Sequence, residues 1–168
     1  PTHYLDFIST ILGKPMIYVR GNHDERYDER PPGGIDLHNK IFHYRGLSFA
    51  GLEGCIRYNK GTIQYTQLEM YRQVTSFAPR MAWHFFRKKR PVDFLIAHSP
   101  PRGIHDIEED YPHRGFNAFL AYMDWYQPRY LLHGHVHTWD RRKAVETDYN
   151  KTTVMNINPY TILDVEVP

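Results

Sequence analysis

The sequence has few of the features that mark secreted, membrane or nucleic-acid-binding proteins. Cys55 is its only cysteine, so no disulfide can form within the chain, and a reducing, cytoplasmic setting is favoured. No apolar run approaches the roughly 18 residues that a transmembrane helix needs. The formal net charge of +2 is too small to indicate binding to nucleic acid or to an anionic membrane.

The composition is otherwise that of an ordinary globular protein, with one exception. The chain has 168 residues, of which 41% are hydrophobic and 24% charged, and we expect residues 1–168 to form a single domain with a packed core. The exception is histidine, which occurs 11 times. Histidine is the commonest metal ligand and titrates near neutral pH, so its positions in the chain are informative.

Hydrophobic spacing predicts strands and helices in alternation. Short buried strands are expected at 16–19, 92–98 and 129–137, and helices at 3–12, 66–77, 79–90 and 115–126. Thr66 and Glu69 have the spacing of a capping box at the start of one helix. Hairpins are expected around Arg45-Gly46 and around Asn158-Pro159. This order favours an α/β fold, in which ligands bind at the carboxyl ends of the strands.

Three of the predicted strands end in loops that are rich in metal-binding residue types. These loops are Gly21-Asn22-His23-Asp24, His98-Ser99-Pro100-Pro101 and His133-Gly134-His135-Val136-His137. If the strands are parallel neighbours, the loops converge at one edge of the sheet. Imidazole, amide and carboxylate groups together suit zinc, manganese or iron. The candidate ligands are the carbonyl oxygen of Asn22 and the ring nitrogens of His98, His135 and His137.

Each of these loops, taken alone, also has a purely structural explanation. Gly, Asn and Asp favour turns, so residues 21–24 can be a simple turn. A histidine at the end of a strand can be packed or solvated without binding anything. His135 and His137 are two residues apart, so they share a face in a regular strand, or turn toward two adjacent ions in a loop. The occurrence of all three loops, each at a strand end, favours the metal site.

Two further features have ordinary interpretations. The basic run at 87–90 is expected to be a solvated helix end, and the aromatic residues, which make up 15% of the chain, mostly fit core positions. Glu53 lies near the metal site if the hairpin at 40–54 reaches it, and is otherwise a surface carboxylate.

The motifs GNHD (21–24), AHSPP (97–101) and GHVH (134–137) resemble the third, fourth and fifth signature motifs of the calcineurin-like metallophosphoesterase superfamily. The resemblance implies a sandwich of two mixed β-sheets flanked by helices. It also implies hydrolysis of phosphomonoesters or phosphodiesters at a centre of two divalent metal ions, which are manganese, iron or zinc.

The resemblance assigns a role to each motif residue. Asn22, His98 and His135 would bind one ion, and His137 would bind the other. His23 corresponds to the catalytic histidine that assists the leaving group, and Asp24 would orient it.

The sequence departs from the family pattern at its amino terminus. The DxH and GD motifs, which supply the remaining metal ligands, do not occur in the 20 residues before Gly21. This departure predicts an amino-terminally incomplete domain that lacks two strands of the first sheet. Two interpretations follow: a phosphoesterase that is active as the full-length protein, or a degenerate relative that binds metal or nucleotide without turnover. A purely structural interaction domain would give no reason for the clustered histidines.

The loop at 101–115 supplies the candidate substrate-binding residues Arg102, His105 and His113. Cationic side chains at the rim of the site would suit a phosphate group, although a solvated loop explains each residue equally well. The expected partner is a small phosphorylated substrate, with neither nucleic acid nor membrane, and the sequence carries no signal for an oligomeric state.

Overall fold

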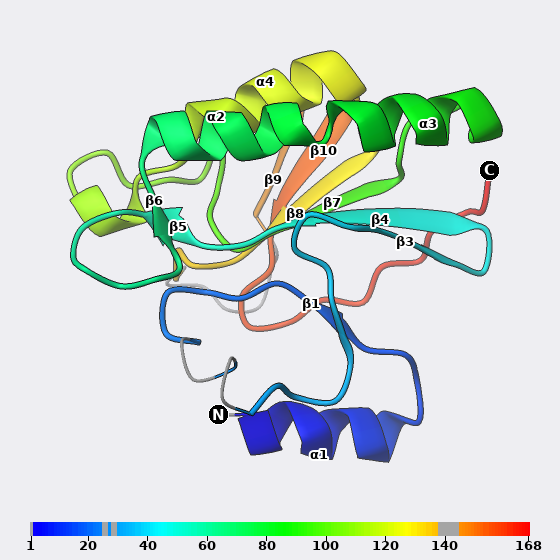
Figure 1. The fold of residues 1–168 in the computed structure, drawn as a ribbon, viewed down its shortest axis with the longest axis horizontal. Coiled ribbons are helices and arrows are strands. Elements are labelled where there is room, and N and C mark those ends of the chain that lie inside the picture. The colour runs from blue at the N-terminus through cyan, green and yellow to red at the C-terminus, as the bar shows by residue number, and fades with distance from the viewer. Residues whose placement is uncertain (1, 25–26, 28–29, 138–144) are drawn as a thin grey trace.

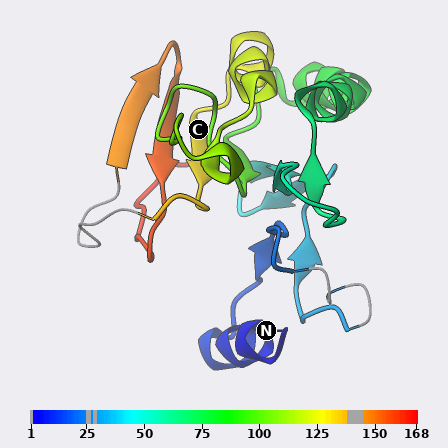
Figure 2. The same cartoon turned by 90° about the vertical axis from the view of Figure 1, so that its left-hand side faces the viewer.

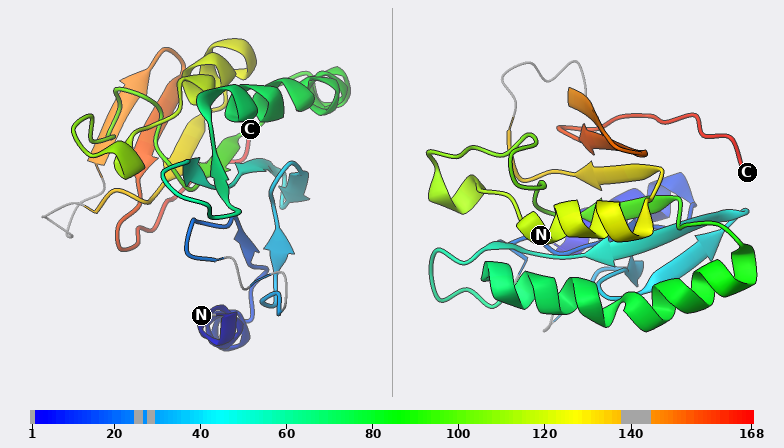
Figure 3. Two further views of the ribbon diagram at one scale, coloured as in Figure 1. Left: turned by 60° about the vertical axis from the view of Figure 1, so that its left-hand side comes forward. Right: turned by 90° about the horizontal axis from the view of Figure 1, so that it is seen from above.

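The structure is a computed structural model that describes residues 2–24, 27, 30–137 and 145–168. Its centre is a six-stranded mixed sheet (Figure 1; Figure 3). The strands are, in spatial order, β3 (Ile41–Tyr44), β4 (Leu47–Leu52), β7 (Phe94–Ala97), β8 (Tyr130–His133), β10 (Thr152–Asn156) and β9 (Val145–Tyr149). The four inner strands are parallel, and each edge strand runs antiparallel to its neighbour.

Three helices cover one face of this sheet (Figure 1). They are α2 (Gln67–Ser76), α3 (Ala78–Lys88) and α4 (Asn117–Tyr126). The core lies between these helices and the sheet, where Val74, Phe77, Phe119 and Tyr122 of the helical layer meet Leu95 of β7, all fully buried. The apolar run of β7 therefore reflects a strand that is covered by helices and flanked by other strands.

Smaller elements lie on the other side of the sheet and at its end. β1 (Ile17–Tyr18) and β2 (Ile35–Asp36) form a parallel pair, and α1 (Thr2–Leu12) lies beyond them (Figure 2). β5 (Cys55–Ile56) and β6 (Gln64–Tyr65) form another parallel pair, and the short 3-10 helix η2 (Tyr111–His113) belongs to the loop after β7. None of the helices in the described part of the chain is long and apolar enough to span a bilayer.

Several local predictions are confirmed. The capping box is present, because the Thr66 hydroxyl accepts the Glu69 amide N–H and the Glu69 carboxylate accepts the Thr66 amide N–H. The hairpin around Arg45-Gly46 is formed by β3 and β4. The helix predicted at 115–126 is present as α4, with Phe119 and Met123 buried and Leu120 partly buried against the core.

The predicted closing hairpin around Asn158-Pro159 is wrong. β10 pairs instead with β9, which precedes it, and residues 157–168 form no strand. β10 already has β8 on one side and β9 on the other, so a strand formed by the last residues would have no free edge to join. The sequence did not predict β9, because this strand is almost entirely exposed and largely polar. The strands that were predicted are apolar runs.

The expectation that the three motif-bearing strands are neighbours holds for only two of them. β7 and β8 are adjacent in the main sheet, whereas β1 pairs with β2 in a separate two-stranded sheet. β1 is also only half-buried, because the main sheet does not cover it on both faces.

The expectation that aromatic residues mostly occupy core positions fails in α3. Trp83, Phe85 and Phe86 are exposed by 61%, 55% and 65%, so this helix presents aromatic side chains to solvent. The basic run at 87–90 marks the end of α3, as expected, with Lys89 as the left-handed C-cap.

Candidate metal centre

The three motif loops meet at one end of the sheet. The loops after β7 and β8 are joined by a hydrogen bond from the Gly134 amide to the His98 carbonyl, with a donor–acceptor distance of 3.1 Å. The loop after β1 approaches them so closely that a Cβ atom at Gly21 would lie 2.5 Å from Cε1 of His98. Residue 21 therefore has to be glycine for the His98 ring to occupy this position.

Asn22, His98 and His135 form the centre of the site. Nε2 of His98 lies 3.1 Å from Oδ1 of Asn22 and 3.0 Å from Nδ1 of His135. Asn22 is 7% exposed. The structure thus brings together three residues that are separated by up to 113 positions in the chain, as the motif order led us to expect.

The hydrogen bonds around these residues fix which atoms face inward. Nε2 of His135 lies 2.9 Å from the carbonyl oxygen of Pro112, which can only accept, so Nε2 carries the hydrogen and Nδ1 of the neutral ring offers a lone pair. The Nδ2 group of Asn22 donates to the hydroxyl of Tyr58 at 2.8 Å, which turns Oδ1 toward His98. His135 itself has a positive φ of 66°, which redirects the chain after β8.

Sequence reasoning did not anticipate Tyr58. It lies in a loop 36 residues from Asn22, and no motif or periodicity distinguishes it from the other tyrosines.

Burial lowers the pKa of the two central histidines, His98 and His135. It lowers the pKa of His98 to about 3, and the nearby rings of His135 and His23 add to this effect, since they would repel a protonated His98 when they are protonated themselves. Burial also lowers the pKa of His135, and His113, His23 and His137 add to this effect. At neutral pH these rings are therefore unprotonated, which is the state that a metal ligand requires.

The donor set fits a divalent metal ion. Oδ1 of Asn22 and Nδ1 of His135 both direct a lone pair toward Nε2 of His98. Without a metal ion, a single hydrogen on Nε2 of His98 would have to be shared between these two acceptors. Ligand atoms at about 2.0–2.1 Å from a shared ion lie roughly 3.0–3.4 Å apart, and both observed separations fall in this range. The bond from His135 to a backbone carbonyl is also typical of metal-binding histidines.

The remaining motif residues lie around this centre without joining it directly. His23 is exposed, and its Nε2 lies 3.3 Å from Nδ2 of Asn22. His137 is also exposed and is near enough to lower the pKa of His135. Asp24 accepts the Gly21 amide at 2.8 Å and bonds to Tyr27. Within the part of the chain that the structure describes, no hydrogen bond joins Asp24 to His23.

The three candidate substrate residues of the loop at 101–115 have different neighbours. His113 lies beside His135, with ring centroids 4.7 Å apart, and is held by Asp110. His105 instead contacts His133 at 3.1 Å. Arg102 is bound by Asp106 and Glu108 of its own loop, so its charge is largely compensated.

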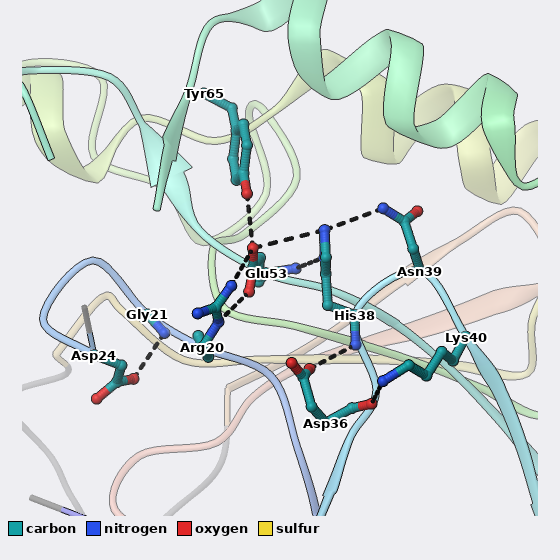
Figure 4. Close-up of polar contacts among 9 residues, drawn as sticks. All are labelled: Arg20, Gly21, Asp24, Asp36, His38, Asn39, Lys40, Glu53 and Tyr65. Atoms are coloured by element: carbon teal, nitrogen blue, oxygen red, sulfur yellow. Dashed lines mark hydrogen bonds and ion pairs between the residues drawn. The ribbon is translucent and has the colours of Figure 1, made fainter. Parts of the chain in front are cut away.

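Glu53 is buried rather than a surface carboxylate, and Figure 4 shows its contacts with Arg20, His38 and Tyr65. Its carboxylate receives Arg20, which directly precedes Gly21, at 2.7 Å, and the Tyr65 hydroxyl at 2.7 Å. His38 lies 3.6 Å away. This network ties the loop that carries Asn22 to the end of β4.

Comparison with known proteins identifies the family of this chain. The chain matches the calcineurin-like phosphoesterase family over residues 1–139 and belongs to that family. Members of the family are typically hydrolytic phosphoesterases that use divalent metals. No curated protein is significantly similar in sequence to this chain.

Solved structures share the fold. One crystal structure is similar with a TM-score of 0.59 and 20% sequence identity, and the similarity covers 95% of this chain and 65% of that chain. The protein TT1561 of Thermus thermophilus is similar with a TM-score of 0.58 and 14% identity, covering 92% of this chain and 67% of its own. The chain thus spans about two thirds of the length of each.

Proposed function

We propose that this domain hydrolyses a phosphomonoester or phosphodiester at a dinuclear centre of manganese, iron or zinc. Asn22, His98 and His135 hold one ion in this proposal, and His137 contributes to the second. The observation that supports it most is the convergence of three donor atoms, because both separations that involve Nε2 of His98 are those that ligands of one ion would have. When bound, the ions supply a hydroxide nucleophile and neutralise the phosphate oxygens.

The residues around the centre have separate roles in this proposal. His23 is exposed next to Asn22, so it can donate a proton to the leaving group of a substrate at the metal centre, a role typically worth about 10² to 10⁴ in rate. Asp24 supports His23 by fixing the loop through Gly21 and Tyr27. His113, beside His135, is the best placed of the three substrate candidates.

The substrate is a small phosphorylated molecule, and the protein acts in the cytoplasm. Arg102 and His105 contribute to the shape of the rim more than to its charge, since Arg102 is bound by two carboxylates and His105 contacts His133.

One observation favours the alternative, a relative that binds metal or nucleotide without turnover. Among the residues that the structure describes, no group of three or more His, Cys, Asp or Glu side chains is arranged to hold a metal ion. The Asn22 site has only two such residues, His98 and His135, and an amide is a weaker ligand than a carboxylate.

The experiment that tests the proposal separates metal binding from turnover. The 168-residue chain and its variants His98→Ala and His135→Ala are titrated with Mn²⁺ and Zn²⁺, and bound metal is measured by elemental analysis. Both variants should bind more weakly than the parent, while His3→Ala, which removes an exposed histidine of α1, should not. Unchanged affinity and stoichiometry in both site variants would disprove the metal centre.

Turnover is then measured with an aryl phosphate. Metal-dependent hydrolysis that His23→Ala reduces, with metal content preserved, supports the phosphoesterase. Metal binding without hydrolysis, in a protein that carries the DxH and GD motifs, supports the alternative. If His23→Ala loses metal and activity together, His23 is a ligand rather than the proton donor.

A further inference from the structure

A concave feature of the molecule lies between α3 and the edge strand β3. It has a volume of about 900 Å³ and shares no lining residue with the Asn22–His98–His135 centre. We call this feature the α3 groove. Pockets of roughly 300–1,000 Å³ are of the size that binds small ligands and cofactors, so the groove is large enough for one.

The charged residues that line the α3 groove are all basic. Lys40, Arg80, Arg87 and Lys88 line it, and none of its described lining residues is acidic. Lys40 and Arg80 bond to backbone carbonyls rather than to carboxylates. In the sequence, no Asp or Glu occurs between Glu69 and Asp93.

A concave surface lined by charges of one sign concentrates the electric field and attracts ions of the opposite sign. The neighbouring His43 responds to this field, because its pKa is lowered first by burial and then by the charges of Lys88 and Arg90. His43 also lies 3.2 Å from the ring nitrogen of His84, and the two rings stack at a centroid distance of 5.3 Å. The exposed ring of His43 and the buried ring of His84 thus line the groove side by side.

Trp83 gives the groove an aromatic wall. Its side chain is 61% exposed, and the guanidinium of Arg87 lies over the indole ring at 5.7 Å from the centroid. An exposed indole beside a guanidinium can stack on an aromatic or apolar group of a ligand while the cation binds its charge.

We propose that the α3 groove binds a phosphate-bearing ligand. Arg80, Arg87 and Lys88 bind the phosphate, and Trp83 packs against the remainder of the molecule. Guanidinium groups favour phosphate because their planar N–H donors match two phosphate oxygens at once. A soluble nucleotide and the headgroup of an anionic phospholipid both present this chemistry. The assignment does not depend on hydrolysis at the metal centre.

The test uses ATP for the soluble source, and vesicles of phosphatidylcholine containing phosphatidylserine for the lipid source. Binding of ATP is measured by calorimetry in the presence of a chelator, so that divalent ions do not recruit it to the metal centre. Binding to vesicles is measured by co-sedimentation. The groove variant is Arg87→Glu/Lys88→Glu.

A matched control has the same change of charge elsewhere. Arg72→Glu/Lys151→Glu alters two exposed cations that do not line the groove. Whichever of the two probes, ATP or vesicles, binds to the parent protein should bind at least about tenfold more weakly to the groove variant, because attraction is replaced by repulsion at two phosphate contacts. The control variant should retain most of the affinity. All four positions are exposed, so thermal unfolding should confirm that both proteins are folded.

The results show whether the phosphate-bearing ligand is soluble or a lipid headgroup, or they disprove the proposal. ATP binding that depends on Arg87 and Lys88 identifies a soluble ligand, and vesicle binding with the same dependence identifies a headgroup. If ATP binds, Trp83→Ala should weaken it more than it weakens inorganic triphosphate, and His98→Ala should leave it unchanged. If neither probe binds, or if the groove and control variants lose affinity equally, the proposal is wrong.

Discussion

Arg20 and Glu53 join the loop of Asn22 to the central sheet through an ion pair with two hydrogen bonds. Nε of Arg20 lies 2.7 Å from Oε2 of Glu53, and Nη2 lies 3.2 Å from Oε1. The Arg20 carbonyl also accepts the amide N–H of Gly54 at 2.9 Å. The position of the metal-site loop therefore depends on a contact between residues 33 positions apart.

Glu53→Gln should destabilise the protein strongly. The substitution removes the negative charge that Arg20 faces in a site where the Glu53 side chain is only 3% exposed, and breaking a buried pair costs about 3–5 kcal/mol. Urea denaturation measures the free energy of unfolding. Glu108→Gln is the matched control, because its carboxylate is 74% exposed and should contribute less than about 1 kcal/mol. Equal losses in the two variants would show that burial of the Arg20 pair contributes nothing.

Gly21→Ala should disrupt the metal centre, and Gly134→Ala should not. A Cβ atom at residue 21 would lie 2.5 Å from the His98 ring, whereas at residue 134 its nearest neighbour would be 3.8 Å away. The first alanine displaces His98 from Asn22, and metal affinity should fall by at least about tenfold, as for loss of a supporting contact. Metal titration of both variants measures the difference. A Gly21→Ala protein with normal affinity would show that the His98 ring can move freely.

Tyr58→Phe should weaken metal binding without unfolding the protein. The change removes the oxygen that accepts the Nδ2 hydrogen of Asn22, so Oδ1 is no longer held toward His98. Loss of such supporting contacts typically costs about 10–100-fold in metal affinity. Tyr111→Phe, at an exposed tyrosine of the loop after β7, serves as the control. Normal affinity in Tyr58→Phe would mean that Asn22 is oriented by its backbone alone.

Stability should fall as the pH is lowered from 7 toward 4. Burial lowers the pKa of His98 to about 3 and that of His133 to about 4, whereas both are near 6.5 in the unfolded chain. The unfolded state binds more protons over this interval, so the free energy of unfolding rises with pH there and is fully restored above about pH 6.5. In metal-free protein, His98→Gln should flatten this dependence, while His3→Gln should preserve it. A midpoint of urea denaturation that is constant between pH 7 and pH 5 would contradict the expectation.

The parts of the fold that were predicted from sequence depend on local signals. The capping box of Thr66 and Glu69 is a contact between residues three positions apart, and the spacing of apolar residues in α4 reflects the turn of a single helix. The candidate ligands were predicted because each follows a predicted strand, and ligands in α/β folds bind at the carboxyl ends of strands. The structure brings Asn22, His98 and His135 together, although β1 lies outside the main sheet.

The parts that were missed depend on contacts across the chain. Tyr58 reaches Asn22 over 36 positions, and Tyr58 belongs to no motif. For Glu53 the sequence left two positions open, and the contact with Arg20 over 33 positions decides between them. The strand β9 was missed because pairing with β10, rather than burial of its own side chains, holds it in the sheet. The separate pairing of β1 with β2 likewise involves only two residues in each strand, which is too short for a pattern.

The polar character of β9 also bears on how one molecule meets another at this edge of the sheet. This strand forms one edge of the main sheet, and its exposed residues include Glu146 and Asp148. A free edge is a template on which a strand of another molecule can add by backbone hydrogen bonding. Here an incoming copy of β9 would bring its own carboxylates against these two, and the repulsion disfavours sheet extension and aggregation at this edge.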